Sequence, residues 1–169
     1  GRYREALETA RRATAEAMAL GDRKREWQAH NLMGIVYHEQ ADATRAYDHF
    51  VQACDTARAM GDLAGEVRML TNIGETHRRS GDFDDAIACY EQILAIAPDV
   101  GARTREGLAV NISLAYAGLG NLAATLRHLD EARALNAATG DRFSRAYIRY
   151  AAAEALLLDG DADAAAAEA

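Results

Sequence analysis

The chain has 169 residues, half of them apolar and 27% charged, and its formal net charge at pH 7 is −7. A chain of this length can bury a hydrophobic core without a metal or a disulfide. The acidic balance argues against a general nucleic-acid binder, because neutralising phosphates requires a surplus of Lys and Arg. No run approaches the roughly 20 apolar residues of a membrane span. We therefore expect a soluble chain with neither nucleic acid nor membrane as partner.

Glycines interrupt a sequence that is otherwise rich in helix formers and contains one proline, Pro98. Between these glycines, apolar residues recur at helical spacing, and β-branched residues never form the runs typical of strands. The pattern predicts an all-α chain whose helices end about every twenty residues. In chain order it predicts the second helix of a truncated repeat at 1–20, two-helix repeats at about 22–60, 62–99 and 101–139, and a partial repeat at 141–169.

Many of these glycines precede a residue that can cap the next helix, as in Gly61-Asp62 and Gly120-Asn121. Glycine readily takes the left-handed conformation that ends a helix, and Asp or Asn accepts a hydrogen bond from the free N–H groups of the following helix. Each pair therefore predicts one helix end and one helix start. Ala41 occupies the place in this series where a glycine is missing.

The sequence AMGDLAGEVRMLTNIG, which begins at Ala59, echoes ALGDRKREWQAHNLMG, which begins at Ala19. A single two-helix unit cannot bury both of its apolar faces, whereas stacked units share a continuous core. We therefore expect one domain over 1–169, a right-handed α-solenoid of stacked antiparallel helix pairs.

The repeat units resemble the tetratricopeptide repeat. The residues that carry the resemblance in the unit after Asp62 are Leu70, Ile73, Gly74, Gly81, Phe83, Ala86, Tyr90, Leu94 and Pro98. In the unit before it they are Trp27, Gly34, Tyr37, Ala46, Phe50 and Ala53, and in the unit after it Tyr116, Gly120, Leu122, Leu129 and Ala132. Gly34, Gly74 and Ser113 are small where we expect the helices of a pair to cross closely.

The repeat length of about 40 residues exceeds the usual 34 of this family. This long form resembles the repeats of Pins-like adaptors and of sensor regions in bacterial transcriptional regulators, which hold a protein or peptide. The resemblance implies a protein-interaction scaffold within a larger regulatory protein. The incomplete repeats at both ends lead us to expect that the chain is a piece of a longer protein.

In such solenoids the first helix of each pair lines a concave groove. Asn72 and Asn111 occupy equivalent places there, and carboxamides can clamp the backbone of an extended peptide. Arginine suits contacts with carboxylates, so an acidic peptide is the expected ligand. The candidate peptide-binding residues are Asn31, Arg68, Asn72, Glu75, Arg78, Arg79 and Asn111. Glu75 is also placed to pair with Arg78 or Arg79 within the helix.

Nothing in the sequence supports catalysis. His38-Glu39 lacks the second histidine of a HExxH zinc site, no phosphate-binding glycine loop occurs, and His77 lies on the packing stripe. Cys54 and Cys89 form no CxxC pair, which indicates neither a zinc site nor a disulfide framework. We expect no catalytic residue, metal or cofactor, and a location in the reducing cytoplasm.

Self-association, or intramolecular regulation without a peptide ligand, is the alternative function. The leucines at Leu156, Leu157 and Leu158 favour this alternative if they are exposed, because contiguous apolar patches mark contact sites. The expected partners are therefore a protein or an acidic peptide, or a second copy of the chain.

Overall fold

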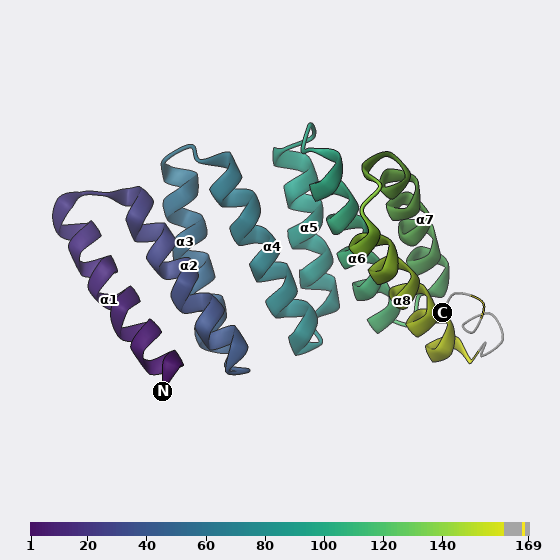
Figure 1. Cartoon of the computed structure of the whole chain (residues 1–169), viewed down its shortest axis with the longest axis horizontal. Helices are drawn as coiled ribbons and strands as arrows, with labels where there is room; N and C mark the ends of the chain where they lie inside the picture. Colours follow the sequence, from purple (N-terminus) through teal and green to yellow (C-terminus); the bar gives the residue numbers. More distant parts are fainter. Residues whose placement is uncertain (161–166, 168–169) are drawn as a thin grey trace. The chain divides into compact units, whose positions relative to one another are not determined.

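The computed structural model describes residues 1–160 and 167, and it shows eight helices and no strand within that part of the chain (Figure 1). The predicted all-α class is confirmed. The helices are α1 (Arg2–Leu20), α2 (Arg23–Glu39), α3 (Ala43–Ala59), α4 (Leu63–Ser80), α5 (Phe83–Ile96), α6 (Ala102–Gly118), α7 (Leu122–Thr139) and α8 (Arg142–Asp159). The last residues of the predicted partial repeat, 161–166, 168 and 169, lie outside the described residues.

The chain divides into two compact units, Gly1–Ser80 with α1 to α4 and Gly81–Ala169 with α5 to α8. The boundary falls within the predicted repeat at 62–99, between its two helices. Inside each unit, consecutive helices pack against each other. We call these parts unit 1 and unit 2. The single solenoid domain over 1–169 stays a prediction.

Glycines end the helices as the sequence predicts. The backbone has a positive φ at six of them, Gly21, Gly61, Gly81, Gly120, Gly140 and Gly160. Ala41, in the place of the missing glycine, takes the same left-handed conformation with φ of 58°. The next helix then starts at a cap, where the side chains of Asp22, Asp42, Asp62, Asn121 and Asp141 accept hydrogen bonds from backbone N–H groups.

The core of unit 1 depends on a close crossing of α2 and α3. A Cβ atom at Gly34 would lie 2.5 Å from Cε1 of Phe50, whose ring is buried. Ala46 and Ala53, also on α3, are completely buried, and Met69 of α4 is buried with them. Small residues on α2 and α3 thus allow the two backbones to approach, and the larger side chains fill the space that remains.

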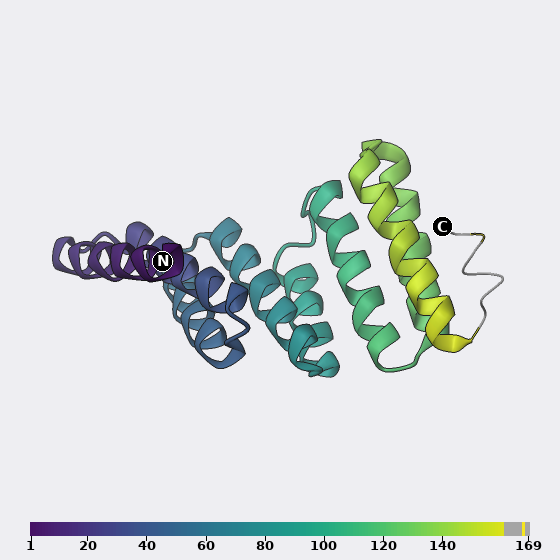
Figure 2. The ribbon, with the colours of Figure 1, turned by 60° about the horizontal axis from the view of Figure 1, so that its bottom comes forward.

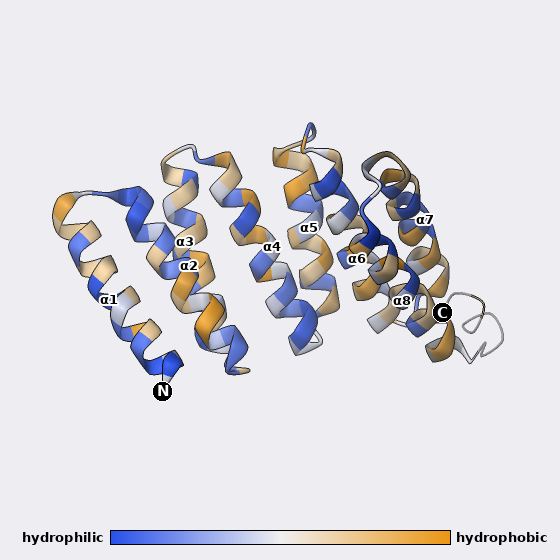
Figure 3. Cartoon of the chain, in the orientation of Figure 1, coloured by the Kyte–Doolittle hydropathy of each residue, from blue (hydrophilic) through white to orange (hydrophobic). Residues whose placement is uncertain are grey.

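In unit 2 the apolar faces of α6, α7 and α8 form one cluster, and these helices lie side by side in both views of the ribbon (Figures 1 and 2). Its buried members are Ala109, Val110, Leu129, Ala132, Ile148, Ala151 and Ala152. Ser113 is also fully buried, and its hydroxyl donates to the Val110 carbonyl oxygen at 2.6 Å. Hydrophilic and hydrophobic residues are interspersed along the helices (Figure 3).

Candidate functional site

Six of the seven predicted site residues lie in unit 1, on α2 and α4. Both helices pack against α3. Arg68, Asn72, Glu75 and Arg79 follow one another at helical spacing along α4, so they share one side of that helix. Side chains of α2 and α4 meet at two places, described below. We call this surface the α2/α4 face, and it comprises Asn31 and His38 of α2 with Arg68, Asn72, Glu75, Arg78 and Arg79 of α4.

The first meeting place is a pair of carboxamides. Nδ2 of Asn72 donates to Oδ1 of Asn31 at 3.0 Å, and both side chains are half-buried. A carboxamide has two N–H donors and an acceptor oxygen with two lone pairs. After this contact, the NH₂ group of Asn31 and the Oδ1 atom of Asn72 can each take a further partner. The pair thus presents one donor group and one acceptor side by side.

The charges on α4 divide into paired and unpaired groups. Arg78 donates from both Nε and Nη2 to the Glu75 carboxylate, at 2.9 and 2.7 Å. This bidentate pair neutralises the charge of the Glu75 carboxylate, as the three-residue spacing of Glu75 and Arg78 allows. Arg68 and Arg79 are exposed, and neither has a carboxylate within salt-bridge distance among the described residues. The positive charge of the α2/α4 face therefore comes from Arg68 and Arg79.

The second meeting place joins His38 and Arg79. Nη1 of Arg79 lies 3.3 Å from both ring nitrogens of His38. A small pocket of about 90 Å³ opens here, lined by His38, Ala41, Ala43, Thr76 and Arg79. Burial lowers the pKa of His38 below its usual value, and the Arg79 guanidinium lowers the pKa further, against the opposing carboxylates of Glu75 and Glu39.

Asn111, the seventh predicted residue, is half-buried on α6 of unit 2. It therefore belongs to a different compact unit from Asn72. Its expected role in peptide binding stays a prediction.

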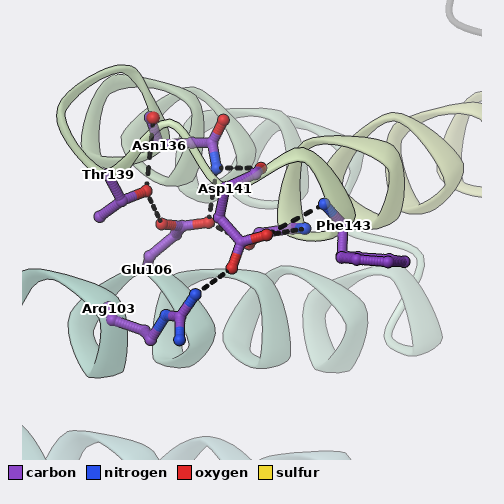
Figure 4. Close-up of polar contacts among 7 residues, drawn as sticks. Arg103, Glu106, Asn136, Thr139, Asp141 and Phe143 are labelled. Carbon is purple, nitrogen blue, oxygen red and sulfur yellow. Dashed lines mark hydrogen bonds and ion pairs between the residues drawn. The ribbon is translucent and has the colours of Figure 1, made fainter.

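Unit 2 contains a buried polar network that was not predicted from the sequence. Glu106 of α6 is 1% exposed and accepts hydrogen bonds from Asn136 Nδ2 at 3.0 Å and Thr139 Oγ1 at 2.9 Å (Figure 4). It also accepts a hydrogen bond from the Ser144 hydroxyl. Because Asn136 and Thr139 lie on α7 and Ser144 on α8, one carboxylate connects three helices.

Electrostatics around Glu106 follow from these contacts. Burial raises the pKa of the Glu106 carboxyl, but the hydrogen bonds from Ser144, Asn136 and Thr139 lower it more, so the net shift is downward. The neighbouring Asp141 carboxylate caps α8 and pairs with Arg103 (Figure 4). Backbone N–H groups of Ser144 and Phe143 hold the pKa of Asp141 below its usual range. The hydrogen bonds of Glu106 thus hold the α7–α8 connection against α6, and we call this network the clasp around Glu106.

Exposed apolar side chains form a stripe along α8. Phe143, Tyr147, Tyr150 and Leu157 recur at helical spacing and are 89%, 45%, 60% and 59% exposed. The rings of Tyr147 and Tyr150 stack with their centroids 6.4 Å apart. Of the three predicted leucines, Leu156 is half-buried and Leu158 lies outside the described side chains. We call these four exposed residues the α8 stripe.

In the described part of the chain, no three His, Cys, Asp or Glu side chains come together in a group that could hold a metal ion. Within the same residues, none of the helices has the length and apolar content that crossing a membrane requires.

Residues 26–99 match the family model described as "Tetratricopeptide repeat". The human intraflagellar transport protein 88 homolog is 27% identical over 89 residues, which are 53% of this chain and 10% of that protein. The chain thus spans about a tenth of that relative.

Similar solved structures cover nearly the whole chain. Aspartyl phosphate phosphatase F from Bacillus subtilis matches with a TM-score of 0.80 and 19% identity, over 96% of this chain and 43% of that one. A Podosopora anserina protein with nearly identical TPR-like repeats matches with a TM-score of 0.68 and 15% identity, over 99% of this chain and 91% of that one. These matches confirm the predicted α-solenoid class. Residues 26–99 therefore carry the tetratricopeptide repeat pattern that the sequence predicts.

Proposed function

We propose that this chain is a non-catalytic protein-interaction region of a larger cytoplasmic regulatory protein, and that its α2/α4 face binds an extended protein segment. Tetratricopeptide repeats generally mediate protein–protein interactions. The names of the similar proteins include a phosphatase and an intraflagellar transport protein, so the shared fold does not select one partner.

The observation that carries the proposal is the contact between Asn31 and Asn72. A peptide backbone offers one N–H donor and one C=O acceptor per residue. The carboxamide pair presents the complementary groups, since the NH₂ group of Asn31 can donate to a carbonyl and Oδ1 of Asn72 can accept from an N–H. Because this contact joins two successive repeats, the pair is already positioned before a ligand arrives, which reduces the entropy lost on binding.

Charge supports an acidic segment as the ligand. Arg68 and Arg79 are exposed on the same side of α4 as Asn72, one turn before it and two turns after it. Guanidinium groups bind carboxylates through charge-assisted hydrogen bonds, which are stronger than neutral ones. We therefore propose that Asn31 and Asn72 hold the backbone of the segment, and that Arg68 and Arg79 select its acidic side chains.

The proposal is tested by selecting binders from a random peptide display library and measuring their affinities for variants by calorimetry. We expect selected peptides to be enriched in Asp and Glu. The double variant Asn31→Ala/Asn72→Ala should lose about thirtyfold in affinity, since it removes two hydrogen bonds that contribute about 1 kcal/mol each. Gln52→Ala is the matched control, because it removes an exposed carboxamide from α3 of the same unit.

Two results would contradict the proposal. A library that yields no binder would argue against peptide recognition by this chain. Binders whose affinity is equal for the double variant and the Gln52→Ala control would place the contact away from the carboxamide pair. Asn111→Ala, measured beside them, determines whether unit 2 also contacts the peptide.

Self-association, or a regulatory role as in a sensor region of a bacterial transcriptional regulator, is the second candidate function, and the α8 stripe favours it. Large exposed apolar side chains in a row are typical of contact surfaces. This function predicts that the molar mass measured by light scattering rises with protein concentration, and that Leu157→Asp keeps the chain monomeric. A parent chain that is monomeric at both low and high concentration would exclude self-association.

A further inference from the structure

The pocket between His38 and Arg79 has the properties of a subsite for a single carboxylate. Its volume of about 90 Å³ holds roughly three waters, or one carboxylate with its neighbouring methylene group. Arg79 contributes a permanent positive charge at its edge, and His38 contributes a ring that becomes positive on protonation. Ala43 is the first residue of α3, so the positive end of that helix dipole also lies at the pocket.

The acidic groups around the pocket leave the charge of Arg79 unneutralised. Glu75 and Glu39 are the carboxylates that act on His38, and Arg78 is the second arginine that does so. The Glu75 carboxylate is bound by both Nε and Nη2 of Arg78. Asp42 caps the start of α3 and pairs with Arg45. Phe50 meets the His38 ring edge to face and carries no charge.

Position along the helices relates this pocket to the carboxamide pair. His38 follows Asn31 by two turns on α2, and Arg79 follows Asn72 by two turns on α4. With a rise of 1.5 Å per residue, the two contacts are about 10 Å apart, which an extended peptide spans in about three residues. A peptide held at the carboxamide pair can therefore place one acidic group in the pocket.

We propose that the His38–Arg79 pocket binds a carboxylate of the ligand and that binding is accompanied by protonation of His38. This inference rests on the proposed function and deepens it. In the free protein, a protonated His38 lies next to the Arg79 guanidinium, and the two positive charges repel. A carboxylate in the pocket that contacts both side chains offsets this repulsion, so it binds better when His38 is charged. By reciprocity, the bound carboxylate favours the charged ring.

The direction of the pH effect follows from this linkage. The pKa of free His38 is below its usual value, so the ring is neutral at pH 7. A bound carboxylate raises the pKa of His38, and proton uptake makes affinity increase as the pH falls from about 7.5 to about 5.5. The ligand carboxylate stays ionised over that range. We expect a gain of at least about fivefold in affinity, at the lower end of typical coupling between two sites.

Small probes test this subsite without a peptide. N-acetylglutamate α-amide presents a side-chain carboxylate, N-acetylalanine presents a C-terminal carboxylate, and N-acetylglutamine α-amide is the neutral control. The readout is the pH titration of the His38 ring resonance by NMR, assigned with His38→Gln. We expect one or both acids to raise the pKa of His38 and the neutral amide to leave it unchanged. The acid with the larger effect identifies the source of the carboxylate.

Variants of Arg79 and His38 distinguish what each side chain contributes to binding of the carboxylate. Arg79→Gln should abolish the response of His38 to the acids, whereas Arg79→Lys, which keeps the charge, should retain part of it. His38→Gln should still bind the acids, but with the same affinity across the pH range. His128 on α7 lies in unit 2 and is the internal control, and the acids should leave its ring resonance unchanged.

The inference is overturned if neither acid changes the pKa of His38, or if the neutral amide changes it equally. These outcomes differ from failure of the proposed function, which appears as absence of binders in the peptide library. Library peptides whose affinity depends on Asn31 and Asn72, but neither on Arg79 nor on pH, would support the proposed function and overturn the carboxylate subsite.

Discussion

Single residues determine how closely the helices of a pair approach. The predicted close crossing at Gly34 is confirmed by the 2.5 Å separation between a Cβ atom built there and the Phe50 ring. Gly107 on α6 gives the contrast, since a Cβ there would meet nothing within 4 Å. A methyl group added at Gly34 would therefore clash with the neighbouring helix, whereas one added at Gly107 would not.

Gly34→Ala should destabilise the chain by about 1–2 kcal/mol, because overpacking against the buried Phe50 outweighs the higher helix propensity of alanine. Gly107→Ala is the matched control and should stabilise it by about 0.5–1 kcal/mol through propensity alone. Urea unfolding followed by circular dichroism at 222 nm measures both. Destabilisation of equal size in the two variants would show that the crossing at Phe50 has no special role.

At the scale of helices, the sequence predicted the ends well and the polar contacts between helices poorly. Gly-Asp pairs are local signals, so the end and the start of consecutive helices could be placed without tertiary information. The clasp around Glu106 depends on Asn136, Thr139 and Ser144, which are distant in sequence. One signal was present, because Glu106 occupies the place that Val67 occupies on the apolar stripe of the previous repeat. A charged residue at such a position indicates buried hydrogen-bond partners.

Glu106→Gln should destabilise the chain by about 1–3 kcal/mol at neutral pH, since hydrogen bonds to an ionised group are replaced by weaker ones. The pKa of Glu106 is lower in the folded chain than its ordinary value of 4.5. Its ionised form therefore stabilises the fold above pH 4.5, and this contribution is lost as the pH falls through the lower, folded-state pKa. The difference in unfolding free energy between parent and variant should shrink below about pH 4.5. A difference that stays constant into acid would show that Glu106 contributes no ionisation-dependent stability.

At the scale of the whole molecule, the repeat period predicted the fold class, while the division into two units had no signal in the sequence. The pattern of glycines and apolar residues continues without interruption through Ser80 and Gly81, where the boundary lies. The carboxamide contact was not predicted either, although both asparagines were. Their partnership depends on the spacing of α2 and α4 about α3, and a repeat pattern specifies which face is buried but not which exposed side chains meet.

Repeat architecture has a consequence for how stability is distributed. Each helix pair contacts its neighbours only, so a local change should remain local. We expect Gly34→Ala to accelerate amide hydrogen exchange in α2 and α3 and to leave Leu129 of α7 and Ile148 of α8 within about 0.5 kcal/mol of the parent. Gly107→Ala should slow amide hydrogen exchange in α6 and leave exchange in α3 unchanged. Equal loss of protection at Phe50 and Ile148 in Gly34→Ala would contradict this locality and would show that the chain unfolds as one cooperative whole.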